Sequence, residues 1–127
     1  MKVKRTERGW AGHFILSYRC LFTRNTLLEY KNVAIVVSTV GRLQKYGNRN
    51  FNNKDFETLG IDRYYETMVF HTDKNDKEFQ DIDVSKQIYF DSDGAINIEY
   101  ADNEANEMHE TVVVEMIKKI KKGELNE

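Results

Sequence analysis

The side chains that could bind a metal or act as nucleophiles here are three histidines and one cysteine: His13, His71, His109 and Cys20. None of them forms a C-x-x-C, H-x-x-x-H or H-E-x-x-H spacing, the patterns that place ligands around zinc. A zinc site would need these residues to converge from distant parts of the chain. The sequence therefore predicts no metal site, and no glycine-rich phosphate-binding or dinucleotide-binding pattern indicates a cofactor.

Two hydroxyl side chains, Ser38 and Thr39, come near the end of an apolar run, at a position where a nucleophile could stand. His109 could supply a base from an expected C-terminal helix. No spacing ties the hydroxyls to this histidine, and Ser or Thr at a strand end is usually structural. We therefore assign no catalytic residues, and a small enzyme of unknown reaction is the third of three functional hypotheses.

Arginines and aromatic residues form an unusual cluster near the N-terminus. Guanidinium groups beside an indole suit phosphate contact and base stacking in single-stranded nucleic acid. The same residue types dominate protein-interface hot spots. A third interpretation packs Trp10 in the core and pairs the arginines with acidic residues. The cluster comprises Arg5, Arg8, Trp10, His13, Arg19 and Arg24, and a second patch open to the same interpretations is Arg63, Tyr64 and Tyr65.

The formal net charge of −2 is the sum of two halves of the sequence whose net charges have opposite signs. Residues 1–63 carry 12 Lys and Arg against 5 Asp and Glu, whereas residues 64–127 carry 7 against 16. Either the halves face each other and compensate, or each presents a charged surface to a partner.

Acidic residues are dense from Asp73 onward. This stretch fails as a calcium-binding loop, because its sixth and twelfth positions hold Glu78 and Val84 rather than Gly and Glu. If its carboxylates share one surface, that surface repels nucleic acid and attracts basic protein grooves, as in proteins that mimic DNA. The residues expected on this acidic face are Asp73, Asp76, Asp81, Asp83, Asp91 and Asp93.

Length and composition favour a single domain over residues 1–127. The chain is 40% hydrophobic and 31% charged, which is typical of a globular protein. No apolar run approaches the roughly 18 residues needed to cross a bilayer, and no secretory signal is recognisable at the start. One cysteine cannot form an internal disulfide, so we expect a reducing compartment, most simply the cytoplasm.

The pattern of apolar residues predicts several strands. Residues 13–28 hold one long strand or two short ones, Val33–Val40 is a nearly continuous apolar strand ended by Gly41, and Lys54–Leu59 is expected to form a helical turn. Tyr64–His71 and Ile82–Phe90 alternate as further strands, and Asp91–Gly94 has hairpin-turn chemistry before an edge strand at residues 96–100.

The C-terminal segment predicts an amphipathic helix. Its apolar residues share one face of a 3.6-residue period, its first turns are acidic and its last turn is basic, which complements the helix dipole. Gly123 suits the position that follows a helix. The predicted fold is therefore α+β, a mainly antiparallel sheet of about four to six strands with this helix packed on one face. The apolar residues are Ala105, Met108, Val112, Val113, Met116, Ile117 and Ile120.

Several stretches resemble a family of short phage, prophage and mobile-element proteins with no established function. The resemblance covers most of the chain. The residues that carry it are the N-terminal motif Arg5–Phe14 (R-T-E-R-G-W-A-G-H-F), Arg24–Glu29, Val36–Gly41, Arg63–Met68, Asp83–Ser85 and Asn103–Glu110.

The resemblance implies a genomic setting in which small non-enzymatic proteins bind and inhibit host proteins, including restriction and CRISPR systems. The leading hypothesis is accordingly a non-catalytic binding protein that modulates or inhibits a host protein. The second hypothesis is nucleic-acid binding through the basic N-terminal half. No membrane partner is expected, and a homo-oligomer is compatible with the sequence.

Overall fold

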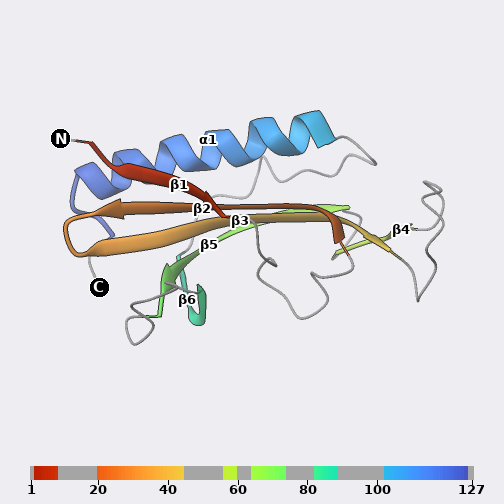
Figure 1. Ribbon diagram of the computed structural model, residues 1–127, viewed down its shortest axis with the longest axis horizontal. Helices are drawn as coiled ribbons and strands as arrows, with labels where there is room; N and C mark the ends of the chain where they lie inside the picture. Colours follow the sequence, from red (N-terminus) through yellow and green to blue (C-terminus); the bar gives the residue numbers. More distant parts are fainter. Residues whose placement is uncertain are drawn as a thin grey trace.

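A computed structural model describes residues 2–8, 20–44, 56–59, 64–73, 82–88 and 102–125. These residues form one antiparallel sheet and one long helix (Figure 1). The elements are β1 (Lys4–Arg8), β2 (Cys20–Tyr30), β3 (Val33–Gln44), β4 (Phe56–Glu57), β5 (Tyr65–Thr72), β6 (Ile82–Ile88) and α1 (Asp102–Lys121).

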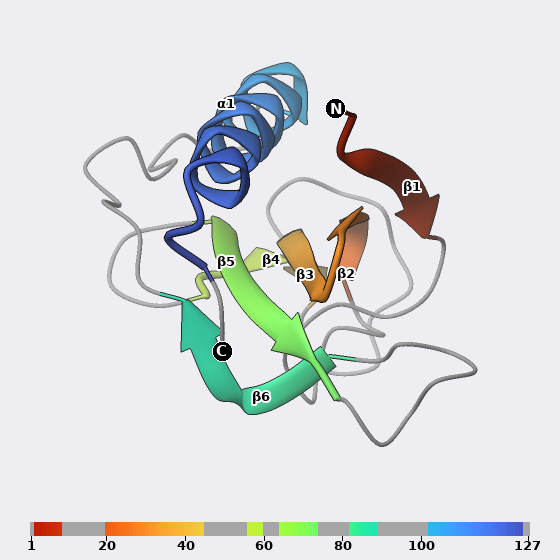
Figure 2. The same ribbon diagram turned by 90° about the vertical axis from the view of Figure 1, so that its left-hand side faces the viewer.

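The strands pair in the order β1-β2-β3-β5-β6, and β4 pairs with the end of β3. The long β2–β3 hairpin is the centre of the sheet, with Tyr30 opposite Val33 and Lys31 in the turn at a φ of 54°. Figures 1 and 2 show α1 along one face and β6 on the other side of the curled sheet. The predicted α+β fold with a C-terminal helix on the sheet is confirmed.

The apolar face of α1 packs against the centre of the sheet. Val112, Val113, Met116 and Ile120 are buried against Leu28 of β2, Ile35 and Val37 of β3, and Val69 of β5. Each fully buried aliphatic side chain contributes about 1.5–3 kcal/mol, so this contact holds helix and sheet together. No helix among the described residues is long and apolar enough to cross a membrane.

As predicted, Gly123 lies just after the end of α1. Its φ is 73°, a left-handed conformation that glycine adopts without steric penalty. The Gly123 amide donates to the carbonyl of Ile120 at 3.0 Å, and the Glu124 amide donates to the carbonyl of Lys119 at 3.0 Å. This is the Schellman pair of hydrogen bonds, and it turns the chain so that Leu125 is buried in the same core.

The prediction that Gly41 ends its strand is wrong, because β3 continues to Gln44. Gly41 pairs with Phe22 on one side and Tyr65 on the other. Arg42 then adopts a φ of 54°, and its amide donates to the carbonyl of Tyr64 at 3.1 Å. The strand therefore kinks after Gly41 but keeps its ladder, and its last residues pair with β4.

Of the other elements predicted from the sequence, some agree with the structure and some do not. The predicted strands over residues 64–71 and 82–90 correspond to β5 and β6. The helical turn predicted for Lys54–Leu59 is wrong, because Phe56–Glu57 form β4. Strand β1 was not predicted, and residues 13–19, the turn at 91–94 and the edge strand at 96–100 lie outside the described residues.

Candidate functional site

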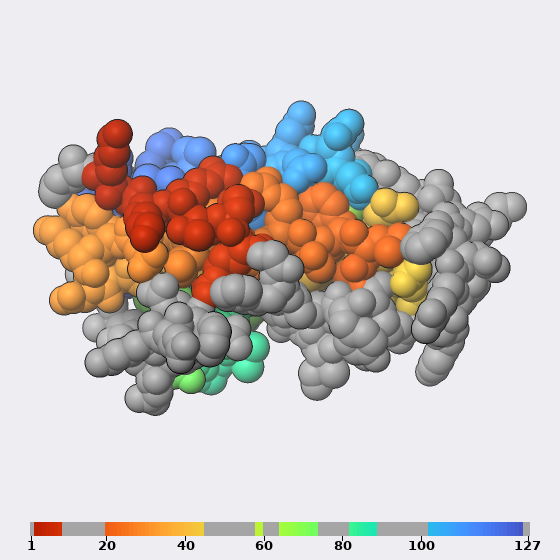
Figure 3. Space-filling model, viewed as in Figure 1, coloured from red at the N-terminus to blue at the C-terminus, as the bar shows by residue number. Residues whose placement is uncertain are grey.

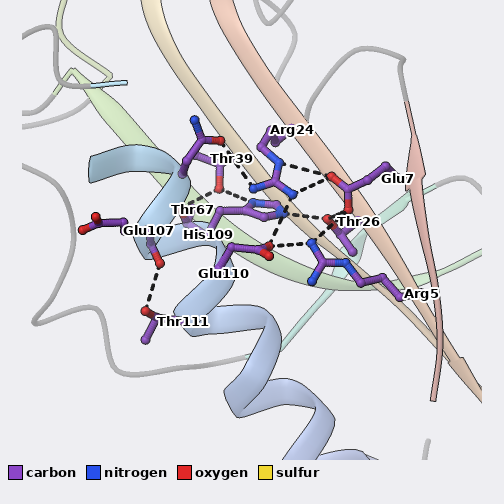
Figure 4. Close-up of polar contacts among 11 residues, drawn as sticks. Arg5, Glu7, Arg24, Thr26, Thr39, Thr67, Glu107, His109, Glu110 and Thr111 are labelled. Atoms are coloured by element: carbon purple, nitrogen blue, oxygen red, sulfur yellow. Dashed lines mark hydrogen bonds and ion pairs between the residues drawn. The ribbon is translucent and has the colours of Figure 1, made fainter. Parts of the chain in front are cut away.

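Polar side chains gather between the sheet and the first half of α1, around His109 (Figure 4). Antiparallel pairing sets Glu7 of β1 opposite Thr26 of β2, and Thr39 of β3 opposite Thr67 of β5. Side chains alternate along a strand, and these four all lie on the face that α1 covers. The site is thus assembled from four strands and the helix.

His109 is fully buried, with 0% of its surface exposed. Its Nε2 atom lies 2.7 Å from Thr26 Oγ1, and its Nδ1 atom lies 2.7 Å from Thr39 Oγ1. Thr39 Oγ1 in turn lies 2.8 Å from Thr67 Oγ1. Both ring nitrogens therefore have partners, as a buried imidazole requires.

The carboxylate of Glu7 sets the direction of every hydrogen bond in this network. Thr26 Oγ1 lies 2.5 Å from Glu7 Oε2, and an ionised carboxylate only accepts, so the Thr26 hydroxyl donates its one proton to Glu7. Thr26 must then accept from His109 Nε2–H, which leaves Nδ1 as an acceptor for the Thr39 hydroxyl. Thr39 has no second proton, so the Thr67 hydroxyl donates to Thr39.

The ionisation states that this hydrogen-bond network requires of His109 and Glu7 agree with the surroundings of the two side chains. Burial, followed by the charge of Arg24, lowers the pKa of His109 to about 4, so the ring is neutral at pH 7. Burial alone would raise the pKa of Glu7, but the hydrogen bonds from Thr26 and Arg24 and the charges of Arg24 and Arg5 outweigh it. The pKa of Glu7 is therefore lowered, and its carboxylate is ionised.

Two arginines and two glutamates from β1, β2 and α1 lie next to this network (Figure 4). Arg24 Nη2 lies 2.7 Å from Glu7 Oε1 and 3.3 Å from Glu110 Oε2. Arg5 Nη2 lies 2.5 Å from Glu110 Oε2 and 3.3 Å from Glu7 Oε2. The hydrogen bond from Arg5 is the main reason that the pKa of Glu110 is lowered. Each glutamate thus contacts both arginines, and the four side chains form a network rather than isolated pairs.

A second polar contact fixes the start of α1. The Tyr65 hydroxyl donates to Asp102 Oδ1, and Arg42 Nη1 lies 3.0 Å from Asp102 Oδ2. Burial, followed by the hydrogen bond to Asp102, raises the pKa of Tyr65. The Tyr65 ring meets Phe22 edge to face, with centroids 5.6 Å apart. The kinked part of β3 is therefore tied to the first turn of the helix.

These contacts position α1 on the sheet, and they keep His109 and Thr39 away from any substrate. Thr39 is also 0% exposed. The hydroxyl and the base that the sequence could not connect are thus in direct contact, but in a closed interior.

Residues of the predicted N-terminal binding cluster occupy different environments. Arg5 and Arg24 belong to the ion-pair network, whereas Arg8 pairs with Asn25 and by strand alternation lies on the opposite face of β1. In the second patch Tyr64 is half-buried and Tyr65 is fully buried. Trp10, His13, Arg19 and Arg63 lie outside the described residues, and a binding role for the cluster stays a prediction.

Of the residues predicted to form the acidic face, the structure describes Asp73 and Asp83, and both lie at one end of the β5–β6 pair. Asp73 follows Thr72, which pairs with Ile82, and Asp83 is the next residue along β6. Asp76, Asp81, Asp91 and Asp93 lie outside the described residues.

Strand β6 carries a large bulge next to these carboxylates. Thr72 pairs with Ile82 and Phe70 with Gln87, so residues 83–86 stand opposite the single residue His71. Such bulges re-aim side chains at sheet edges. The bulge presents Val84 with 66% of its surface exposed, the largest value for a large hydrophobic residue in the part of the chain that the structure describes.

The His109 network is the feature that sequence reasoning missed. A signal was present, because His109 follows Ala105 by four residues and precedes Val112 and Val113 by three and four, which places it on the apolar face. Thr26, Thr39 and Thr67 gave no comparable signal, since threonine is common in strands.

The described part of the chain contains no group of three or more His, Cys, Asp or Glu placed to hold a metal ion. Comparison of the chain with protein-family models, with curated proteins and with solved structures finds no significant match.

Proposed function

We propose that this chain is a small binding protein that acts by occupying the surface of another protein, and that the bulge of β6 is part of the contact. The observation that carries the proposal is Val84, which is 66% exposed on a bulge of β6, the last strand of the sheet that the described residues form. An apolar side chain held out from a sheet edge, beside carboxylates, suits a partner with an apolar pocket rimmed by basic residues.

Hydrogen bonds within the bulge support this proposal, because they shape it before any partner arrives. Asp83 Oδ1 accepts from the Ser85 amide at 3.0 Å and from the Ser85 hydroxyl at 2.6 Å. Lys86 Nζ lies 3.8 Å from the other Asp83 oxygen. A preformed contact loses less conformational entropy on binding.

The charge layout favours a protein over nucleic acid as the partner. Arg5 and Arg24 already contact Glu7 and Glu110, so a phosphate would have to displace carboxylates. Asp83 would repel a phosphate backbone at the β6 edge. Given the resemblance to phage and mobile-element proteins, we propose a host protein, for example a component of a defence system, as the partner.

The test is capture of a partner from a bacterial host lysate by the tagged chain, followed by binding measurements with the purified partner. Val84→Lys and Asp83→Lys should each weaken binding about tenfold or more, the size of a hot-spot effect. Leu21→Lys is the control, because Leu21 is an exposed hydrophobic residue on β2, outside β6 and α1. Equal binding by all variants, or salt-sensitive binding to DNA or RNA in place of a protein, would contradict the proposal.

A further inference from the structure

The outer face of α1 carries a stripe of exposed residues whose charges change sign halfway along the helix. The stripe consists of Glu107, Thr111, Val114, Lys118 and Lys121, all of which are exposed. Their spacings of four, three, four and three residues keep them on one side of an α-helix. Figure 3 shows α1 along the upper outline of the molecule.

The stripe is self-complementary about Val114. Glu107 precedes Val114 by seven residues and Lys121 follows it by seven. If a second α1 lies antiparallel with the two Val114 side chains in contact, each Glu107 faces Lys121 of the other copy. Thr111 and Lys118 then fill the positions between the centre and the ends.

From this symmetry we infer that α1 is a homodimerisation surface, on which a second copy of this chain packs its own α1 antiparallel across a two-fold axis at Val114. A two-fold contact uses the same patch on both copies. This stripe meets that condition, because its apolar centre contacts its own copy and its acidic end faces the basic end of the other copy. Val114 is 52% exposed, and burying it twice removes apolar surface from water.

The surface beside the stripe is hollowed, which leaves room for side chains of the second copy. A hollow of about 660 Å³ follows the helix, and its described lining includes Thr111, Val114 and Lys118. The inward-facing residues of α1 already pack against the sheet, so, among the described residues, the outer face of α1 is the side that another helix can contact.

The inference does not depend on the β6 contact, since α1 and β6 lie on different sides of the sheet (Figure 2). A single helix pair is a small interface, so association should be weak and should depend on ionic strength. We expect sedimentation equilibrium to show a monomer–dimer equilibrium that weakens as NaCl rises from about 20 mM to about 300 mM, where charges are largely screened.

A charge-swap series tests the register directly. Glu107→Lys and Lys121→Glu should each raise the dimer dissociation constant about tenfold, because each change places like charges opposite each other twice. The double variant should recover the original affinity, and so should an equimolar mixture of the two single variants, which forms a heterodimer. Lys31→Glu in the exposed β2–β3 turn is the charge-matched control and should change nothing.

Cross-linking tests the position of the two-fold axis. In a Cys20→Ala background, Val114→Cys should oxidise rapidly to a disulfide-linked dimer, because only residues at the axis meet their own copies. Lys31→Cys should cross-link slowly. Equal cross-linking rates, a charge swap without recovery, or a strictly monomeric protein at low salt would overturn the inference. Far-UV circular dichroism confirms that each variant is folded.

Discussion

Tyr65 lies directly opposite Gly41 in the β3–β5 pair, and its ring occupies the space that a Cβ atom on Gly41 would need. An ideal Cβ at Gly41 would lie 2.1 Å from Tyr65 Cδ1 and 2.6 Å from Cε1. The missing side chain on β3 thus allows the tyrosine to lie flat on the sheet and reach Asp102 at the start of α1.

Gly41→Ala should therefore destabilise the protein by about 3 kcal/mol, because the ring must move out of a packed interior. Urea unfolding measures the loss. Combining Gly41→Ala with Tyr65→Leu should cost clearly less than the sum of the two single changes, because the smaller side chain makes room. Strict additivity would show that the two residues do not compete for space.

Stability should fall as the pH is lowered from 7 toward 4, because of His109. The fold lowers the pKa of His109 from 6.5 to about 4, so the unfolded chain takes up a proton in this range and the folded chain does not. The stabilisation is fully present above pH 6.5 and is lost progressively as the pH falls to about 4. Its size is on the order of 3 kcal/mol.

Urea unfolding at several pH values checks this, with His109→Gln as the control. Glutamine also carries a donor and an acceptor but does not titrate, so the variant should be less stable at pH 7 and should lack most of the slope between pH 6.5 and 4. An unchanged slope would assign the pH dependence to other groups.

The three threonines should differ in their effects on stability in a way that follows from the direction of the hydrogen bonds. Thr26→Val leaves the buried His109 N–H without an acceptor and removes one hydrogen bond from Glu7, which keeps its contacts with Arg24 and Arg5. We therefore expect a loss of about 2–3 kcal/mol. Thr39→Val leaves the His109 acceptor nitrogen unsatisfied, with a loss of about 1–2 kcal/mol. Thr67→Val removes only a donor to Thr39 and should cost about 1 kcal/mol or less. Thermal or urea denaturation would contradict the assigned directions if Thr67→Val proved the most damaging.

The tautomer of His109 can be observed by NMR. The hydrogen-bond chain requires the proton on Nε2, with Nδ1 unprotonated at pH 7. Nitrogen-15 chemical shifts of the ring distinguish the two tautomers. A proton on Nδ1 would mean that the Thr26 hydroxyl does not donate to Glu7.

Local patterns predicted the elements whose burial follows a simple period. The apolar residues of α1 recur with the helical period, and Gly123 marks its end because only a left-handed residue closes a Schellman motif. Strand β1 was missed because K-R-T-E-R has no apolar residue. Its place at the sheet edge depends on pairing with β2 and on contacts from Arg5 and Glu7, which sequence alone does not show.

The site was less predictable because its members come from five elements. Thr39 and His109 are 70 residues apart, and only the packing of α1 on β3 joins them. Glycine often terminates strands, so the sequence predicts a strand end at Gly41, whereas in the structure the Tyr65 ring takes the place of its side chain.

The hydrogen bonds from Thr67 through Thr39, His109 and Thr26 to Glu7 all run in one direction, since each group donates toward β1. No single hydroxyl or imidazole in this network can turn around alone without placing two protons or two lone pairs against each other. The four donors therefore reorient together or not at all. A change of charge on Glu7, on the outermost strand, is in this way communicated to a hydroxyl on β5.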